Sequence, residues 1–159
     1  MPAPKRVRLS RVRGWRMPEG AIKVDRSTRL GNPFDFRKSE CCWVALSFGC
    51  RGDALGRQKA SVLAFSAWIN PPDGRRTLSS EIQPKMGRGK KWGALGPKIT
   101  AGEAPKIEDA IAALAGHDLA CWCSLCPAHK DGLPFGVNCP DCAPCHADVL
   151  LALANGADA

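Results

Sequence analysis

A cysteine-rich stretch near the C-terminus constrains this chain more than any other part of it. Six of the nine cysteines and two of the three histidines lie between Asp118 and Ala154. The stretch opens with an apolar segment at 118–122 (DLACW) and closes with another at 147–154 (ADVLLALA). These patterns predict a strand and a helix, with the side chains suited to metal binding or nucleophilic chemistry in the loop between them.

Spacing within that loop defines a first group of residues. Two residues separate Cys126 from His129, and two separate Cys139 from Cys142. Tight turns of this kind, about a dozen residues apart, supply the ligands of a tetrahedral Zn²⁺. Cys123 also precedes Cys126 at the same spacing, so the fourth ligand is either His129 or Cys123. The loop has few apolar residues, and residues 124–143 are therefore predicted to be an insertion ordered by Zn²⁺.

The alternative is that these cysteines are reduced thiols in a flexible loop, or form disulfides. Disulfides need an oxidising compartment, and the basic N-terminal segment lacks the apolar run of an export signal. We therefore expect a cytoplasmic protein. No apolar run reaches the length that crosses a membrane, so no membrane partner is expected.

A second group consists of Cys121, Cys123, Cys145 and His146. Pro144 suits the first position of a helix, which would place Cys145 in the first turn, where the helix dipole favours anions and thiolates. Cys121 and Cys123 point to the same face of the predicted strand. If that face meets the helix start, the group forms an anion-binding or nucleophilic pocket, or shares in metal binding. Otherwise Cys121 and Cys123 are small buried core residues.

Charge is distributed unevenly along the chain. The net charge of +8 combines residues 1–30, with nine Lys/Arg against two acids, and residues 99–159, with two against eight. This asymmetry predicts a polyanionic or phosphorylated partner. Ordinary solubility is the alternative explanation.

The segment 26–34 (RSTRLGNPF) is a candidate site for such an anion. Gly31 is expected to adopt a backbone conformation that other residues resist, and Asn32 continues the turn. The flanking arginines offer forked donors suited to phosphate. The candidate ligand residues are Arg26, Arg29, Gly31 and Asn32, together with Arg16 in the preceding turn.

The remaining pattern predicts one α/β domain over residues 1–159, with a small layered sheet, flanking helices and a zinc-knuckle loop near the C-terminus. Strands are expected at 5–12, 21–25, 41–48 and 118–122, and helices at 56–70, 107–115 and 147–154. In the first strand Val7, Leu9 and Val12 should face inward, and Arg6, Arg8 and Arg11 outward. Residues 71–105 are rich in Pro, Gly and basic residues, and their segment 85–92 is a candidate flap for contacting phosphates.

Four segments resemble domain-of-unknown-function family 4326 of bacterial and phage proteins. They are RVRLSRVRGWRMP (6–18), VDRSTRLGNPF (24–34), DLACWC (118–123) and PCHADVLLALAN (144–155). In that family a few residues usually join the last two elements. The long joint here supports an inserted zinc loop, and the resemblance marks Cys121, Cys123, Cys145 and His146 as the family's core constellation. It implies no established activity.

Two hypotheses for function follow. The first is a protein that binds a nucleotide-like or phosphorylated ligand between the arginine-flanked turn and the Cys-His helix start. If it is an enzyme, Cys145 is the candidate nucleophile and His146 the candidate acid or base. Adjacent helical residues point about 100° apart, so the two should not pair directly. The alternative is a zinc-stabilised DNA- or RNA-binding accessory protein without catalysis, or a structural module. Neither specifies an oligomeric state.

Overall fold

The structure is a computed structural model that describes residues 3–32, 34, 36–37, 42–70 and 107–156. Its backbone divides into two compact units. The first combines residues 1–31 with 107–159, and the second is the intervening segment 32–106. The expected flap at 85–92 lies outside the described residues. The proposal of one domain over 1–159 stays a prediction.

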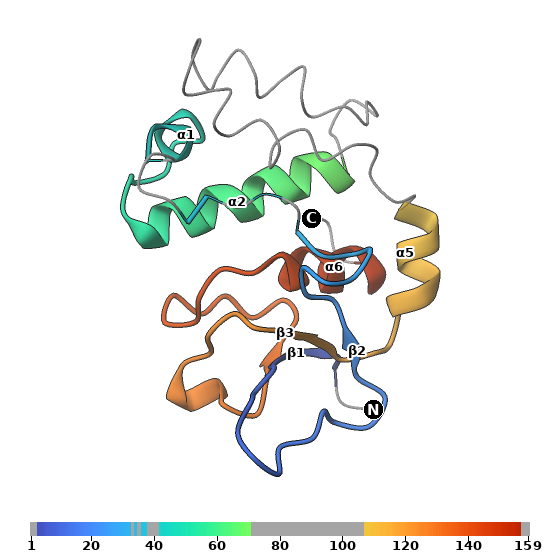
Figure 1. Cartoon of the computed structure of the whole chain (residues 1–159). Helices are drawn as coiled ribbons and strands as arrows, with labels where there is room; N and C mark the ends of the chain where they lie inside the picture. The colour runs from blue at the N-terminus through green and yellow to red at the C-terminus, as the bar shows by residue number, and fades with distance from the viewer. Residues whose placement is uncertain (1–2, 33, 35, 38–41, 71–106, 157–159) are drawn as a thin grey trace. The chain divides into compact units, whose positions relative to one another are not determined.

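The first unit is built on a four-stranded mixed sheet with the strand order β2-β3-β1-β4. Figure 1 labels β1, β2 and β3. The strands are β1 (Lys5–Arg8), β2 (Ile22–Lys23), β3 (Leu119–Cys121) and β4 (Leu133–Pro134). β3 runs parallel to both β1 and β2, and β4 is antiparallel to β1. The predicted α/β class is therefore confirmed, with shorter strands than the sequence indicated.

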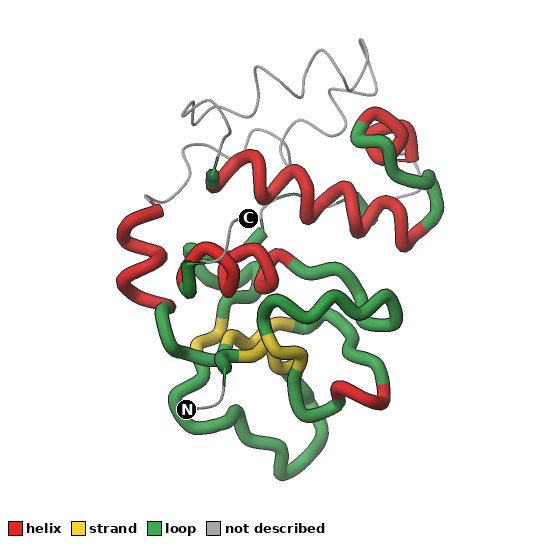
Figure 2. The backbone as a smooth tube through the Cα atoms, turned by 180° about the vertical axis from the view of Figure 1, so that it is seen from behind, coloured by secondary structure: helices red, strands yellow, loops and turns green. Residues whose placement is uncertain are grey.

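Helices α5 (Ile107–Leu114) and α6 (His146–Ala154) pack on each other, and α6 also contacts β1 and β3. Figure 2 shows the strands lying beneath α6. The opposite sheet face carries a small apolar cluster, in which Val7 and Leu9 meet Ala120. Because side chains alternate along a strand, Arg6 points to the face that α6 covers.

Arg6 is only 1% exposed, and its Nη1 lies 2.9 Å from Oδ2 of Asp148 on α6. The prediction that Arg6 faces solvent is therefore wrong. β1 is an interior strand covered by a helix, so alternation of basic and apolar residues does not mark an exposed face there. Val12 is also misplaced by the sequence pattern, because it lies beyond β1 and is 73% exposed.

The second unit contains α1 (Cys42–Ser47) and α2 (Ala54–Ile69). The predicted helix at 56–70 is confirmed, and Asp53 caps it by accepting a hydrogen bond from Gly56 N at 2.8 Å. Its buried face joins an aromatic cluster in which Phe34 and Trp68 pack edge to face at 5.9 Å.

The strand predicted at 41–48 is wrong, because residues 42–47 form α1. A glycine stop signal explains the helix. Gly49 has a φ of 76°, and the amide of Cys50 donates to the carbonyl of Ala45 at 2.9 Å. These are the left-handed residue and the long hydrogen bond of a Schellman C-cap. No helix within the described residues has the length and hydrophobicity to cross a membrane.

Candidate metal centres

The first candidate centre lies in the loop that follows β3. Cys126 is the N-cap of a short 3-10 helix, η2 (Pro127–His129), which turns His129 back toward it. Cys139 and Cys142 occupy a second tight turn, closed by a hydrogen bond from Cys142 N to Cys139 O at 3.3 Å. Each two-residue spacing thus forms a turn that directs both of its side chains to one side.

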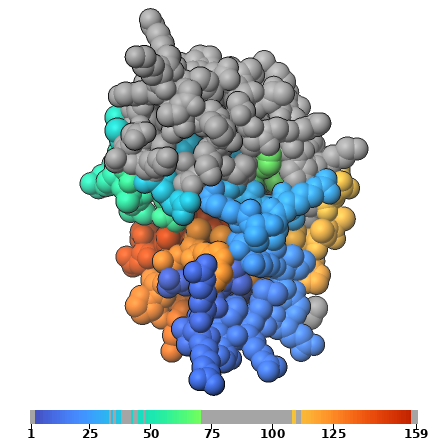
Figure 3. Space-filling view, in the orientation of Figure 1, coloured from blue at the N-terminus to red at the C-terminus, as the bar shows by residue number. Residues whose placement is uncertain are grey.

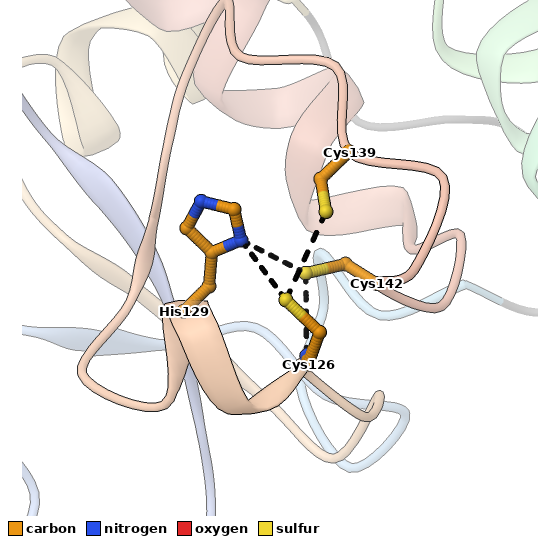
Figure 4. Close-up of side chains that lie close together, drawn as sticks. All are labelled: Cys126, His129, Cys139 and Cys142. Atoms are coloured by element: carbon orange, nitrogen blue, oxygen red, sulfur yellow. Dashed lines mark hydrogen bonds between the residues drawn. The ribbon is translucent and has the colours of Figure 1, made fainter.

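The four side chains point toward one another (Figure 4). Cys126 Sγ lies 3.1 Å from His129 Nδ1 and 3.8 Å from Cys139 Sγ. Cys142 Sγ lies 3.5 Å from the same imidazole nitrogen. All four ligand atoms are within 4.8 Å of one another, so the group could hold a metal ion. His129, rather than Cys123, completes this group.

Electrostatics within the group favour a cation. Burial, together with the neighbouring Cys126 and Cys139 thiols, raises the pKa of the Cys142 thiol to about 11. Burial also acts to raise the pKa of Cys139, but hydrogen bonds from the backbone amides of Asp141 and Cys142 and from the Cys142 and Cys126 thiols together outweigh it and lower the pKa. Adjacent sulfurs cannot all ionise easily unless a positive charge lies between them.

Little else holds this loop together. Its core consists of the buried Leu133 with Cys126 and Cys142, against which Leu125 and Cys139 pack. β4 pairs with β1, and Phe135 N donates to Pro4 O at 3.1 Å, which attaches the loop to the sheet.

The second candidate centre joins the end of β3 to the start of α6. The sulfurs of Cys121, Cys123 and Cys145 lie within 4.8 Å of one another and could also hold a metal ion. Cys145 is the N-cap of α6, and its Sγ accepts from Ala147 N at 3.5 Å. The prediction that Cys145 lies in the first helical turn is therefore wrong by one position, since the helix begins at His146.

His146 lies beside these thiols. Its Nδ1 is 3.8 Å from Cys145 Sγ, and its Nε2 is 2.5 Å from Val24 O. The expected divergence of Cys145 and His146 is wrong, because Cys145 has extended backbone angles (φ −148°, ψ 142°) and stands outside the helix. A carbonyl oxygen only accepts, so Nε2 carries the proton of that hydrogen bond.

The thiols of this cluster have pKa values shifted in opposite directions. Hydrogen bonds from Cys123, Cys145 and His146 lower the pKa of Cys121. Cys121 in turn raises the pKa of Cys123 to about 11, and burial raises that of Cys145 well above its ordinary value. Cys145 is only 1% exposed. A buried thiol with a raised pKa is a poor nucleophile, so this geometry does not favour catalysis by Cys145.

Three backbone amides of the arginine-flanked turn are occupied by hydrogen bonds within the turn. Asp25 Oδ1 accepts from Ser27 N at 3.1 Å, and Asp25 O accepts from Thr28 N at 3.0 Å. The amide of Gly31 donates to Thr28 O at 3.0 Å. Gly31 is required by close approach, since a Cβ there would lie 2.2 Å from Asp25 O, and its φ is not positive.

The other predicted ligand residues of this region differ in exposure, since Asn32 is buried and the arginines are exposed. The Asn32 side chain is buried, donates to Ser61 Oγ at 2.9 Å and accepts from Phe34 N at 2.8 Å. Arg16, Arg26 and Arg29 are exposed. An anion-binding role for this turn stays a prediction.

An exposed basic and aromatic surface was only partly foreseen from the sequence. All side chains from 11 to 20 are exposed (Figure 3, blue). The guanidinium of Arg11 lies 4.9 Å from the ring centroid of Trp122, whose Nε1 donates to Asp25 Oδ2 at 2.8 Å. The sequence could have predicted the exposure of Trp122. Because Trp122 lies between Cys121 and Cys123, which are expected to share one face of the predicted strand, its side chain should point to the other face.

The fold and its clusters define a small mixed α/β protein with one Cys/His group and one group of three cysteines, each of which could hold a metal ion. The cysteines within the described residues are free thiols. A family model, Domain of unknown function (DUF4326), matches residues 7–156, and the chain belongs to that family. No curated protein and no solved structure matches the chain.

Proposed function

We propose that this protein is a zinc-stabilised module that binds single-stranded nucleic acid through its basic N-terminal segment. The observation that supports it best is the exposed surface on which Arg11 stacks over Trp122. The proposal places the protein in a reducing compartment such as the cytoplasm, where thiolates remain available to Zn²⁺.

Zn²⁺ suits the first centre in donor chemistry and spacing. Thiolate and imidazole are the ligands of structural zinc sites. With Zn–S near ~2.3 Å and Zn–N near ~2.0 Å, tetrahedral geometry separates two sulfurs by about 3.8 Å and a sulfur from a nitrogen by about 3.5 Å. The observed separations are 3.8 Å between Cys126 and Cys139, and 3.1 and 3.5 Å to His129 Nδ1.

The charged surface suits a polyanion. Arg8, Arg11, Arg13 and Arg16 are exposed, and none of them forms an ion pair with the residues that the structure describes. Trp15 and Trp122 stand in the same unit with 37% and 40% of their surfaces exposed. Arginine binds phosphates, and exposed aromatic rings stack on unpaired bases, so the combination favours single strands over duplexes.

The zinc loop would support this surface indirectly. β1, which pairs with β4, ends at Arg8, shortly before Arg11, Arg13 and Arg16. The same β1 pairs with β3, which ends at Cys121, immediately before Trp122. An ion that orders the loop therefore steadies the strand from which Arg11 extends.

Salt dependence tests the proposal. Binding of a fluorescent single-stranded oligonucleotide is measured by anisotropy over a range of salt concentrations. Each phosphate contact contributes roughly 0.7 to the slope of log affinity against log salt, so the triple variant R11A/R13A/R16A should lose about 2 units of slope. Arg51→Ala is the matched control, because Arg51 is exposed but paired with Asp53 at 3.0 Å. A slope that the triple variant leaves unchanged contradicts the proposal.

A small phosphorylated ligand at the arginine-flanked turn is a second candidate. It is supported by the exposure of Arg26 and Arg29 on a turn that the buried Asp25 holds in place. Thermal shift with nucleotides and inorganic phosphate distinguishes the two functions. Stabilisation that Arg29→Ala abolishes while oligonucleotide affinity is kept would support the small ligand.

A further inference from the structure

The thiol cluster at the start of α6 has a ligand geometry of its own, independent of the nucleic-acid surface. Cys121 and Cys123 come from the end of β3, and Cys145 comes from a position more than twenty residues further along the chain. Three sulfurs from two separate elements converge within 4.8 Å, while Cys121 and Cys145 are 6% and 1% exposed. Packing small apolar residues does not require three sulfurs to meet at one point.

His146 carries the support that metal-bound histidines normally have. Its Nε2 donates to the carbonyl of Val24, which fixes the ring with Nδ1 toward the thiols, 3.8 Å from Cys145 Sγ. A ring nitrogen held by a backbone carbonyl opposite the ligand nitrogen is a common outer-shell arrangement in metal sites.

A buried cation supplies a second, independent observation. The Arg6 side chain is 1% exposed, and its Nη1 pairs with Asp148, whose own side chain is 40% exposed. Its Nε and Nη2 are buried and have no hydrogen-bond partner among the described residues. β1 pairs with β3, and Arg6 and Cys121 project to the same face of the two strands. A buried guanidinium needs a nearby anion.

We propose that Cys121, Cys123, Cys145 and His146 bind a second metal ion, a Cys₃His site for Zn²⁺. Three thiolates around a divalent ion carry one net negative charge, which Arg6 would balance. Uncharged thiols would leave the guanidinium with Asp148 alone. Sulfur and imidazole donors select zinc over magnesium or calcium.

The two centres are adjacent in the chain and share a backbone connection. Cys123 belongs to one and Cys126 to the other, and the amide of Ala143 donates to Ser124 O at 3.0 Å between them. The inserted loop thus enters and leaves through a hydrogen-bonded pair of residues that stands between the two ligand sets. No residue belongs to both ligand sets.

Metal stoichiometry tests the second site. Untagged protein is purified under reducing conditions, and bound zinc is counted by native mass spectrometry and elemental analysis. We expect two ions per wild-type chain and one in either Cys123→Ser or Cys142→Ser. Cys50→Ser is the control that should keep two, because Cys50 belongs to neither cluster. In cobalt-substituted protein, Cys123→Ser should lose roughly half of the thiolate-to-metal absorbance.

A single ion in the wild-type protein, retained in Cys123→Ser, overturns the proposal. Two ions retained in Cys123→Ser also overturn it, because the second ion must then bind elsewhere. If Cys123→Ser does not fold, the wild-type count decides. Rapid alkylation of Cys121 and Cys145 in the zinc-loaded protein is equally contrary, since bound thiolates react slowly.

Discussion

Removing the ion from the first centre should unfold its loop while the rest of the chain stays folded. Ordering the twelve residues 127–138 costs about 12–24 kcal/mol in backbone entropy. Burial of Leu125 and Leu133 returns about 3–5 kcal/mol. The backbone hydrogen bonds of His129, Gly132, Phe135 and Val137 return about 1 kcal/mol each. The shortfall is about 10 kcal/mol, within reach of a structural zinc ion, which contributes about 10–16 kcal/mol.

Hydrogen exchange followed by mass spectrometry measures this directly. In Cys142→Ser, peptides covering residues 126–142 should exchange within seconds, as unfolded chain does. The amide of Asn70, which donates to Ser66 O at 3.0 Å at the end of α2, should keep its protection. Treating the wild-type protein with a zinc chelator should reproduce the effect in the loop, and Cys50→Ser should not.

Retained protection of Gly132 and Cys142 in the metal-free protein would refute this reasoning. It would mean that the pairing of β4 with β1 and the small leucine core suffice to order the loop. The zinc ion would then be bound by a preformed site rather than ordering one.

Two further predictions concern the turn around Asp25. Gly31→Ala should cost about 3 kcal/mol of unfolding free energy, because its Cβ would lie 2.2 Å from Asp25 O. Gly20→Ala is the comparison: its Cβ meets open space, and the substitution should cost about 1–2 kcal/mol because the φ of Gly20 is positive. Equal losses in urea denaturation would contradict this. Burial acts to raise the pKa of Asp25, but hydrogen bonds from Ser27 and Trp122 outweigh it and lower the pKa below 3.8. The Asp25 carboxylate therefore stabilises the fold above pH 3.8, and this stabilisation is lost as the pH falls through the folded-state pKa. Trp122→Phe should move that pKa upward in a carboxyl NMR titration, and an unchanged titration would exclude the indole as a cause.

Local signals predicted the elements that depend on local chemistry. The helix at 56–70 has a strong cap in Asp53, and the two-residue cysteine spacings define turns whatever surrounds them. Residues 42–47 are β-prone, which predicts a strand, but they form a helix that Gly49 stops with its positive φ. Glycine at a helix end was the more informative signal.

Contacts between distant residues were beyond local signals. The burial of Arg6 depends on Asp148, which lies 142 residues away in sequence. The choice between His129 and Cys123 depends on where β3 ends relative to α6, which no spacing rule specifies. The sequence did indicate that Cys126, Cys139 and Cys142 would form one group and Cys121, Cys123 and Cys145 another, since metal-type side chains are rare and their spacing limits where they can point.

The order of the strands has a consequence for synthesis on the ribosome. β1 emerges first, yet its parallel neighbour β3 begins only at Leu119. At about 5–20 residues per second, β1 waits roughly 6–22 s for that neighbour to be synthesised. The segment 32–106 is finished during the interval. Residues 32–106 of a newly made chain are therefore synthesised before β1 can pair with β3. The translation rate through these residues determines how long β1 stays unpaired.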